Sequence, residues 1–246
     1  MASSSARASY ASSELVINSD RSMAFKRLLA TRAAKPCPGF VMIGAAMLWV
    51  GWFGFNGGSQ LAADGGAAMA ITVTHISAAA ASITWAVWER FKFGKASLVG
   101  MVTGTIAGLA SITPAAGSVD PLQALLIGAI AGILCQEVVN LVRNMFNIDD
   151  TLDVFAVHGI GGMLGTILCG LLMSSDLGGV GFDDGLSAYD QIKIQIYSVL
   201  VTLIWTAVFT YVILKVISLI IPIRVSEEQE IDGLDTSSHG ESGYNI

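Results

Sequence analysis

The sequence has few charged residues for its length. Only 13% of its 246 residues are Asp, Glu, Lys or Arg, whereas 53% are hydrophobic, and the mean hydropathy is +0.66. An ordinary soluble domain carries about 25% charged residues. The low charge content therefore excludes that class and indicates a membrane protein. The formal net charge is -6, and no nucleic-acid partner is expected.

Cysteines are also few. Cys37, Cys135 and Cys169 have no metal-ligand or redox spacing, so no metal site or cofactor is expected. Cys135 and Cys169 lie within apolar stretches, where cysteine usually acts as a packing residue.

The apolar stretches lack the alternation of polar and apolar residues that marks a membrane β-barrel. A membrane-spanning helix needs about 20 mostly apolar residues. Short polar connections separate the stretches of this kind, which are Pro38 to Leu61, Gly65 to Trp88, Leu98 to Ala116, Pro121 to Val142, Val154 to Met173 and Ile192 to Ile221. The predicted fold is all-α, a polytopic membrane helical bundle of about six transmembrane helices.

Lys and Arg are absent from the first, third and fifth connections between these stretches. The basic residues near the stretches are Arg27, Arg32, Lys35, Arg90, Lys92, Lys95, Arg143 and Arg224. Such residues are enriched in cytoplasmic segments, and with about six spans they all fall on one side. We therefore predict a multi-pass plasma-membrane protein with both termini in the cytoplasm.

The two ends of the chain differ from its middle. Residues 1–35 are Ser-rich and basic, and they lack the apolar core of a secretory signal. A transit peptide is the alternative to a disordered basic tail, but Glu14 and Asp20 count against it. Residues 36–223 form the predicted transmembrane domain. Residues 224–246 are polar and acidic, with too little apolar surface for a core of their own, and are expected to dock as a cytoplasmic tail.

Small residues recur at four-residue spacing within the predicted spans. These rows are Gly100, Gly104 and Gly108, then Gly128 and Gly132, and then Gly161 and Gly165. Such rows let helix backbones approach closely in a membrane. They predict tight helix packing and carry no chemistry.

His158 stands out because polar side chains within membrane spans usually face the bundle interior or a water-filled path. Helical spacing predicts one shared face for the set Asp153, Val154, His158, Gly161 and Gly165. A buried histidine that packs within the protein remains the alternative to a histidine in a pathway.

Other polar residues have simpler interpretations. Asp149 and Asp150 precede the fifth stretch and are expected to cap its first turn. His75 is expected to be a packing histidine. An intramembrane metal enzyme using His75, His158 and Asp153 is disfavoured, since these residues lack close ligand spacing, and no enzymatic activity is expected.

The segment LWVGWFGFNGGSQ concentrates aromatic residues in the first stretch. Trp49, Trp52, Phe53 and Phe55 are followed by a Gly-Gly-Ser run that ends at Ser59. A belt at the membrane interface is one interpretation. The alternative is a cavity where ring faces and a hydroxyl meet a ligand, since ring faces bind cations with about 0.5–2 kcal/mol per contact.

Four motifs in order, GWFGFNGGS, TGTIAGLASITPAAG, IDDTLDVFAVHGIGG and RVSEEQEIDGLDTSSHGESGY, resemble the ammonium transporter family, the Amt/Mep/Rh group. The resemblance runs from about Ala45 to the C-terminus. It implies a homotrimer in which each subunit has its own pore, built from two inverted five-helix halves and a last helix. This chain resembles the second half with the last helix. Because the match fades at KPCPGF, where the family has a motif like HNLP, a truncated gene or incomplete gene model is expected.

The resemblance also implies roles for single residues. His158 is similar to one of two pore histidines, Phe55 to a pore-gating phenylalanine and Ser59 to the hydroxyl of an external ammonium site. Trp52 and Val154 match pore-lining positions. Asp153 is expected to brace the structure near the histidine.

The implied function is transport of ammonium or ammonia, with ammonium losing its proton and ammonia and the proton passing the pore histidines. Since the family's first five spans are not matched, the chain is expected to be a piece of an ammonium channel that does not conduct alone. Association with a separately made first half is the alternative within the transport function. The alternative is a non-transporting, ammonium-sensing membrane partner that binds PII-type signalling proteins at the cytoplasmic face.

Overall fold

The computed structural model describes residues 37–146, 148 and 150–241. The predicted tail at residues 1–35 lies outside these residues. The chain divides into two compact units, with Cys37–Val208 in one and the residues from Phe209 onward in the other.

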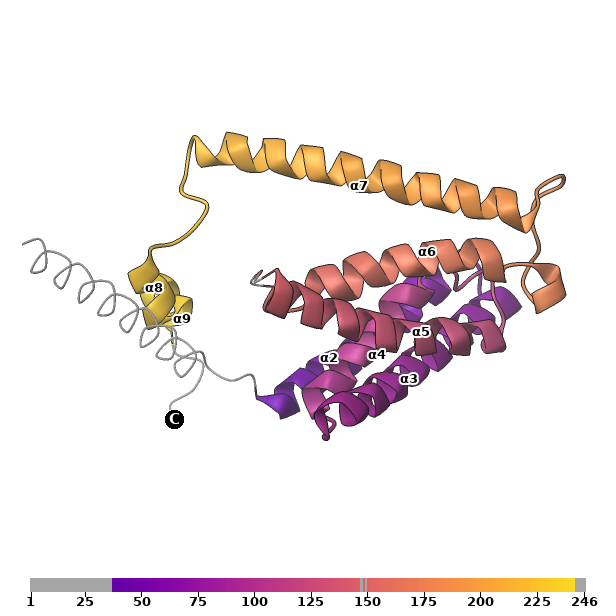
Figure 1. Cartoon of the computed structure of the whole chain (residues 1–246), viewed down its shortest axis with the longest axis horizontal. Coiled ribbons are helices and arrows are strands. Elements are labelled where there is room, and N and C mark those ends of the chain that lie inside the picture. The colour runs from indigo at the N-terminus through magenta and orange to yellow at the C-terminus, as the bar shows by residue number, and fades with distance from the viewer. Residues whose placement is uncertain (1–36, 147, 149, 242–246) are drawn as a thin grey trace, which may run out of the picture. The chain divides into compact units, whose positions relative to one another are not determined.

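The described residues form helices and no strands, so the all-α prediction is confirmed (Figure 1). The elements are α2 (Pro38–Gly58), α3 (Gly65–Phe93), α4 (Leu98–Ile112), α5 (Pro121–Asn140), η1 (Leu141–Met145), η2 (Phe155–Ile160), α6 (Gly161–Leu172), η3 (Ser175–Leu177), α7 (Ala188–Ser218), α8 (Glu227–Asp232) and α9 (Leu234–His239). Five of the helical segments are long and apolar enough to cross a membrane, and α4 is a shorter apolar helix. Each of the six predicted stretches coincides with one of these helices.

Capping residues set several of the helix boundaries. The Asp64 carboxylate accepts a hydrogen bond from the backbone of Ala67 at the start of α3, and α3 ends at Gly94, whose φ is 77°. The Ser97 hydroxyl caps α4, and Pro121 begins α5. Capping side chains satisfy donors that a helix start leaves free, and glycine adopts the left-handed conformation at a helix end without strain.

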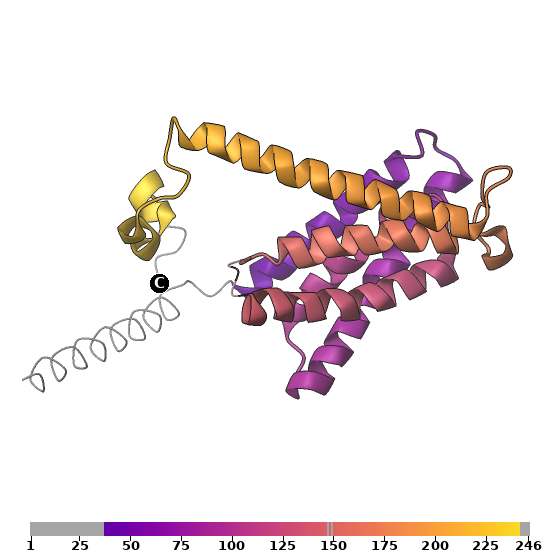
Figure 2. The ribbon, with the colours of Figure 1, turned by 45° about the horizontal axis from the view of Figure 1, so that its top comes forward.

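Helix α3 packs against α4 and α5 (Figure 2). Glycines allow the close contacts between these helices. A Cβ atom at Gly108 would lie 2.5 Å from the Ser77 carbonyl oxygen, and one at Gly128 would lie 2.2 Å from it. The Ser77 hydroxyl also donates to the Gly108 carbonyl at 2.9 Å. The predicted close packing along these glycine rows is confirmed.

The third glycine row, Gly161 and Gly165, lets α6 pack closely on α4. A Cβ atom at Gly165 would lie 1.8 Å from the Ser111 carbonyl oxygen, and one at Gly161 would lie 3.0 Å from its hydroxyl. The prediction that these glycines share a face with Val154 and His158 is wrong, because both glycines are buried whereas Val154 and His158 are exposed. His158 belongs to η2, a π-helix, whose wider turn changes the angle between successive side chains.

The C-terminal unit contains the short helices α8 and α9. Ser226 and Gln229 form a reciprocal capping box at the start of α8. Arg224 forms an ion pair with Glu230 at 2.6 Å, and its guanidinium lowers the pKa of the Glu230 carboxyl. Local polar contacts therefore give the described part of the tail secondary structure without an apolar core.

The close packing at Ser77 predicts that one methyl group added at Gly128 lowers the stability of the fold. Gly128→Ala should lower the midpoint of thermal unfolding in detergent, since overpacking a tight contact costs about 1–3 kcal/mol. Gly54→Ala is the matched control, because a Cβ atom there meets nothing within 4 Å. Equal midpoints for the two variants would show that the close contact is not needed.

The placement of Lys and Arg predicts that cysteines introduced at two positions, one in each variant, lie on opposite sides of the membrane. In a background with the exposed Cys37 replaced by alanine, Gly117→Cys should react with an impermeant maleimide added to intact cells. Ser238→Cys should react only after the membrane is opened. Gly117 is chosen because its side-chain position is open. Labelling of both positions from the same side would contradict the six-span topology.

Candidate functional site

An aromatic cluster brings together residues of α2 and η2 that are far apart in the sequence. The rings of Trp52 and His158 are stacked, with centroids 6.4 Å apart and an interplanar angle of 12°. The Phe55 ring meets Trp52 edge-on at 5.9 Å. Three of the five residues to which the sequence assigned pathway roles therefore form one cluster.

A hydrogen bond from α2 to the end of α4 fixes the Trp52 ring. The Trp52 indole nitrogen donates to the Thr113 hydroxyl oxygen at 2.8 Å, while that hydroxyl donates to the Leu109 carbonyl at 2.7 Å. Sequence analysis did not single out Thr113, although it lies in the quoted stretch TGTIAGLASITPAAG. Its partner is 61 positions away, so no local pattern revealed the pair.

The cluster lies on an open face of the molecule. Phe55 is 62% exposed and Val154 is 49% exposed, and the His158 side chain is also exposed. Trp52 and Phe55 line an apolar cavity of about 690 Å³ along α2. Polar and aromatic side chains at this face are accessible to a ligand or to another polypeptide segment.

Ser59 lies one helical turn beyond Phe55, and its hydroxyl donates to the Phe55 carbonyl at 2.7 Å. This bond leaves the lone pairs of the hydroxyl oxygen available as acceptors. Ser59 is exposed, so it can offer oxygen to a cationic ligand at the end of α2.

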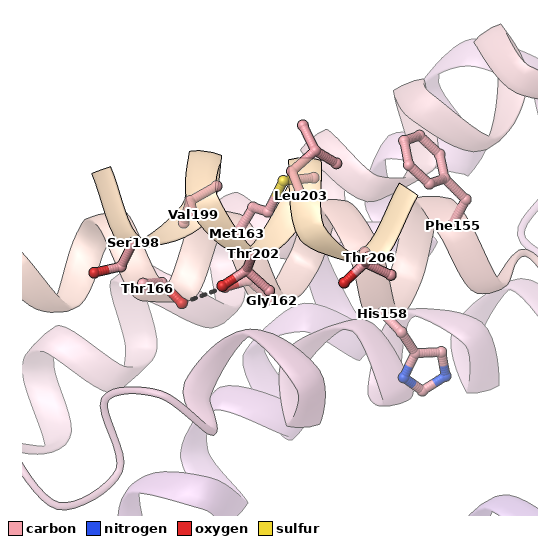
Figure 3. Close-up of a pocket in the computed structure, with 11 residues that line it drawn as sticks. Phe155, His158, Gly162, Met163, Thr166, Ser198, Val199, Thr202, Leu203 and Thr206 are labelled. Carbon is pink, nitrogen blue, oxygen red and sulfur yellow. Dashed lines mark hydrogen bonds between the residues drawn. The ribbon is translucent and has the colours of Figure 1, made fainter. Parts of the chain in front are cut away.

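A second cavity, of about 450 Å³, lies beside His158 between η2, α6 and α7 (Figure 3). Hydroxyl groups line it, and they come from Thr166 of α6 and from Ser198, Thr202 and Thr206 of α7. The three α7 residues recur every four positions and so share one helical face. Sequence analysis missed this row, although its spacing was visible.

His75 belongs to a different cluster. Its ring lies 5.2 Å from that of Trp49 and 6.0 Å from that of Phe53, whereas His158 stacks on Trp52. Trp49 thus packs its ring against His75. Among residues 37–146, 148 and 150–241, no three His, Cys, Asp or Glu side chains form a group that could hold a metal ion.

The connection before η2 is organised by acidic residues. The Asp150 carboxylate accepts hydrogen bonds from the backbone nitrogens of Val154 and Phe155, both at 2.9 Å, which confirms its capping role; Asp149 lies outside the described residues. Asp153 forms an ion pair with Arg143 at 2.8 Å. Burial raises the pKa of the Asp153 carboxyl, while the Arg143 guanidinium opposes that rise.

Comparison with known proteins identifies the wider group. The profile of the Ammonium Transporter Family matches residues 29–244. An ammonium transporter of Aquifex aeolicus is 42% identical over 84% of this chain and 48% of its own length. An ammonium transporter of Bacillus subtilis is 42% identical over 83% of this chain and 51% of its own length.

A solved structure supports the same assignment. The structure called "Sensor Amt Protein" has a TM-score of 0.75 and 29% identity, and the match covers 80% of this chain and 48% of that one. The chain spans about half the length of the curated relatives it matches. With a profile match over most of its residues, the chain belongs to the ammonium transporter family.

Proposed function

We propose that this chain forms one wall of a transmembrane pathway for ammonium and ammonia. The observation that carries the proposal is the stack of Trp52 on His158, with Phe55 against its edge, on an open face. The proposal is also supported by the family of the chain and by its several apolar helices, which are typical of a multi-pass membrane protein.

The chemistry of the cluster suits a cation that must lose its proton to cross. A charge at the centre of a bilayer costs between about 3 and more than 10 kcal/mol. Aromatic faces and the Ser59 oxygen can replace part of the hydration of ammonium at the entrance. Deeper in, the His158 imidazole can accept or donate a hydrogen bond, so it can take part in passing ammonia and a proton.

The open face requires an opposing wall. Substrate sites of transporters built from repeats lie near the bilayer midplane, at the interface between the repeats. We propose that further polypeptide covers Phe55, Val154 and His158, supplied by a segment equivalent to the family's first half. We also propose that the completed subunits assemble as a homotrimer, as the family resemblance implies.

A growth assay tests the pathway. A bacterial strain without ammonium transporters would produce this chain together with the part of the Bacillus subtilis relative that the chain does not cover. We expect this pair, but not the 246-residue chain alone, to restore growth on low ammonium. Loss of a hydrogen-bond partner costs about 1–3 kcal/mol, so His158→Ala should lower ammonium uptake by about 5- to 150-fold.

His75→Ala is the matched control, because it removes a second exposed imidazole that also lies beside a tryptophan. It should leave uptake close to that of the unchanged pair, at equal chain levels in the membrane by immunoblot. Uptake that survives His158→Ala would contradict the proposed role of this histidine. Robust uptake by the chain alone would contradict the need for an opposing wall.

The second candidate function is ammonium sensing without transport. The resemblance of this chain to "Sensor Amt Protein" favours it, as does a tail in which a capping box and the Arg224–Glu230 pair order α8. Such a tail offers a docking element for a PII-type signalling protein. A chain that only sensed ammonium would fail to restore growth in every combination of the assay above.

A further inference from the structure

Arg143 makes two of the contacts that hold the connection between η1 and η2. Arg143 lies in η1, and its Nη2 atom is 2.8 Å from the Asp153 carboxylate and donates to the Thr151 carbonyl oxygen at 3.3 Å. One side chain of η1 therefore binds two residues of the segment that leads into η2.

Asp153 adopts a backbone conformation that residues with a side chain seldom adopt. Its φ is 55°, in the left-handed region, where a Cβ atom crowds the following carbonyl oxygen. Only 13% of its side chain is exposed. A strained and largely buried carboxylate persists only where surrounding contacts hold it, and the contact present here is Arg143.

Asp153 is also the first residue of the turn that carries the pathway histidine. Its carbonyl oxygen accepts a hydrogen bond from Val157 at 2.9 Å, and His158 is the next residue. The Asp153 peptide therefore helps to set the start of η2, together with the Asp150 carboxylate that accepts hydrogen bonds from Val154 and Phe155. His158 follows this first turn directly in η2, so a change in the turn would alter the position of its ring relative to Trp52.

We propose that Arg143 is a positioning residue for His158, acting through Asp153 to fix the start of η2 and the stack on Trp52. This proposal rests on the proposed function of His158 for its role in transport, but its structural content does not. Arg143 itself has no place in the aromatic cluster.

A second ion pair provides an internal comparison. Lys92 of α3 binds Glu137 of α5 at 2.7 Å, and both side chains are more than one-third exposed. This pair joins two helices that already pack closely along glycine rows. Breaking it leaves no buried charge, whereas loss of Arg143 leaves the largely buried Asp153 carboxylate unpaired, which is the costly case.

The test is NMR of the full chain in lipid nanodiscs with labelled histidine. The chain has only three histidines, so substitution of each one assigns its signals, and the Trp52 ring gives His158 a distinct chemical shift. Arg143→Gln and Asp153→Gly should both shift the His158 signals and leave those of His75 in place. Asp153→Asn keeps a side chain at the left-handed position and removes the charge, so it tests the ion pair apart from the backbone strain, whereas Asp153→Gly removes both.

Lys92→Gln is the matched control and should leave the His158 signals unchanged. Arg143→Lys retains the charge and should shift them less than Arg143→Gln; with Asp153→Asn, it decides the question if Arg143→Gln does not fold. Unchanged His158 signals in the Arg143 variants, or an equal shift in Lys92→Gln, would overturn the proposal. Uptake that survives His158→Ala would refute the proposed function alone, because the NMR result does not depend on transport.

Discussion

Close approach of helix backbones is the constraint on which the rest of this structure depends. Lipid supplies no hydrophobic drive between helices, so their association relies on close packing and polar contacts. Gly108 of α4 and Gly128 of α5 both lie close to the α3 backbone at Ser77. Gly165 of α6 lies close to the α4 backbone at Ser111 in the same way. The positions of α4 and α6 then place the residues that hold Trp52 and stack on it.

The candidate site combines fixed and open parts. Trp52 is tied to α4 through the Thr113 hydroxyl, and its ring meets both His158 and Phe55. The outer faces of Phe55 and His158 remain exposed. This arrangement fits the proposed pathway wall, because the ring positions are set within the chain while the opposite side is open.

Much of this architecture could be predicted, because short local sequence patterns indicate membrane spans and rows of small residues. The six stretches, the capping role of Asp150 and the close contacts of Gly108 and Gly128 are of this kind. Two features could not be predicted. The π-turn at His158 changes the helical phase, and His158 is exposed whereas Gly161 is buried. The Trp52–Thr113 hydrogen bond depends on the tertiary fold, since no sequence pattern links two residues that are 61 positions apart.

The fold of this chain alone brings the Trp52 indole against the His158 imidazole. The direct measurement is solid-state NMR of the chain in lipid bilayers, with tryptophan and histidine selectively labelled and each signal assigned by substitution. We expect a through-space cross-peak between Trp52 and His158, because their ring centroids lie 6.4 Å apart. A spectrum in which the Trp49–His75 pair gives its cross-peak and the Trp52–His158 pair gives none would contradict this arrangement.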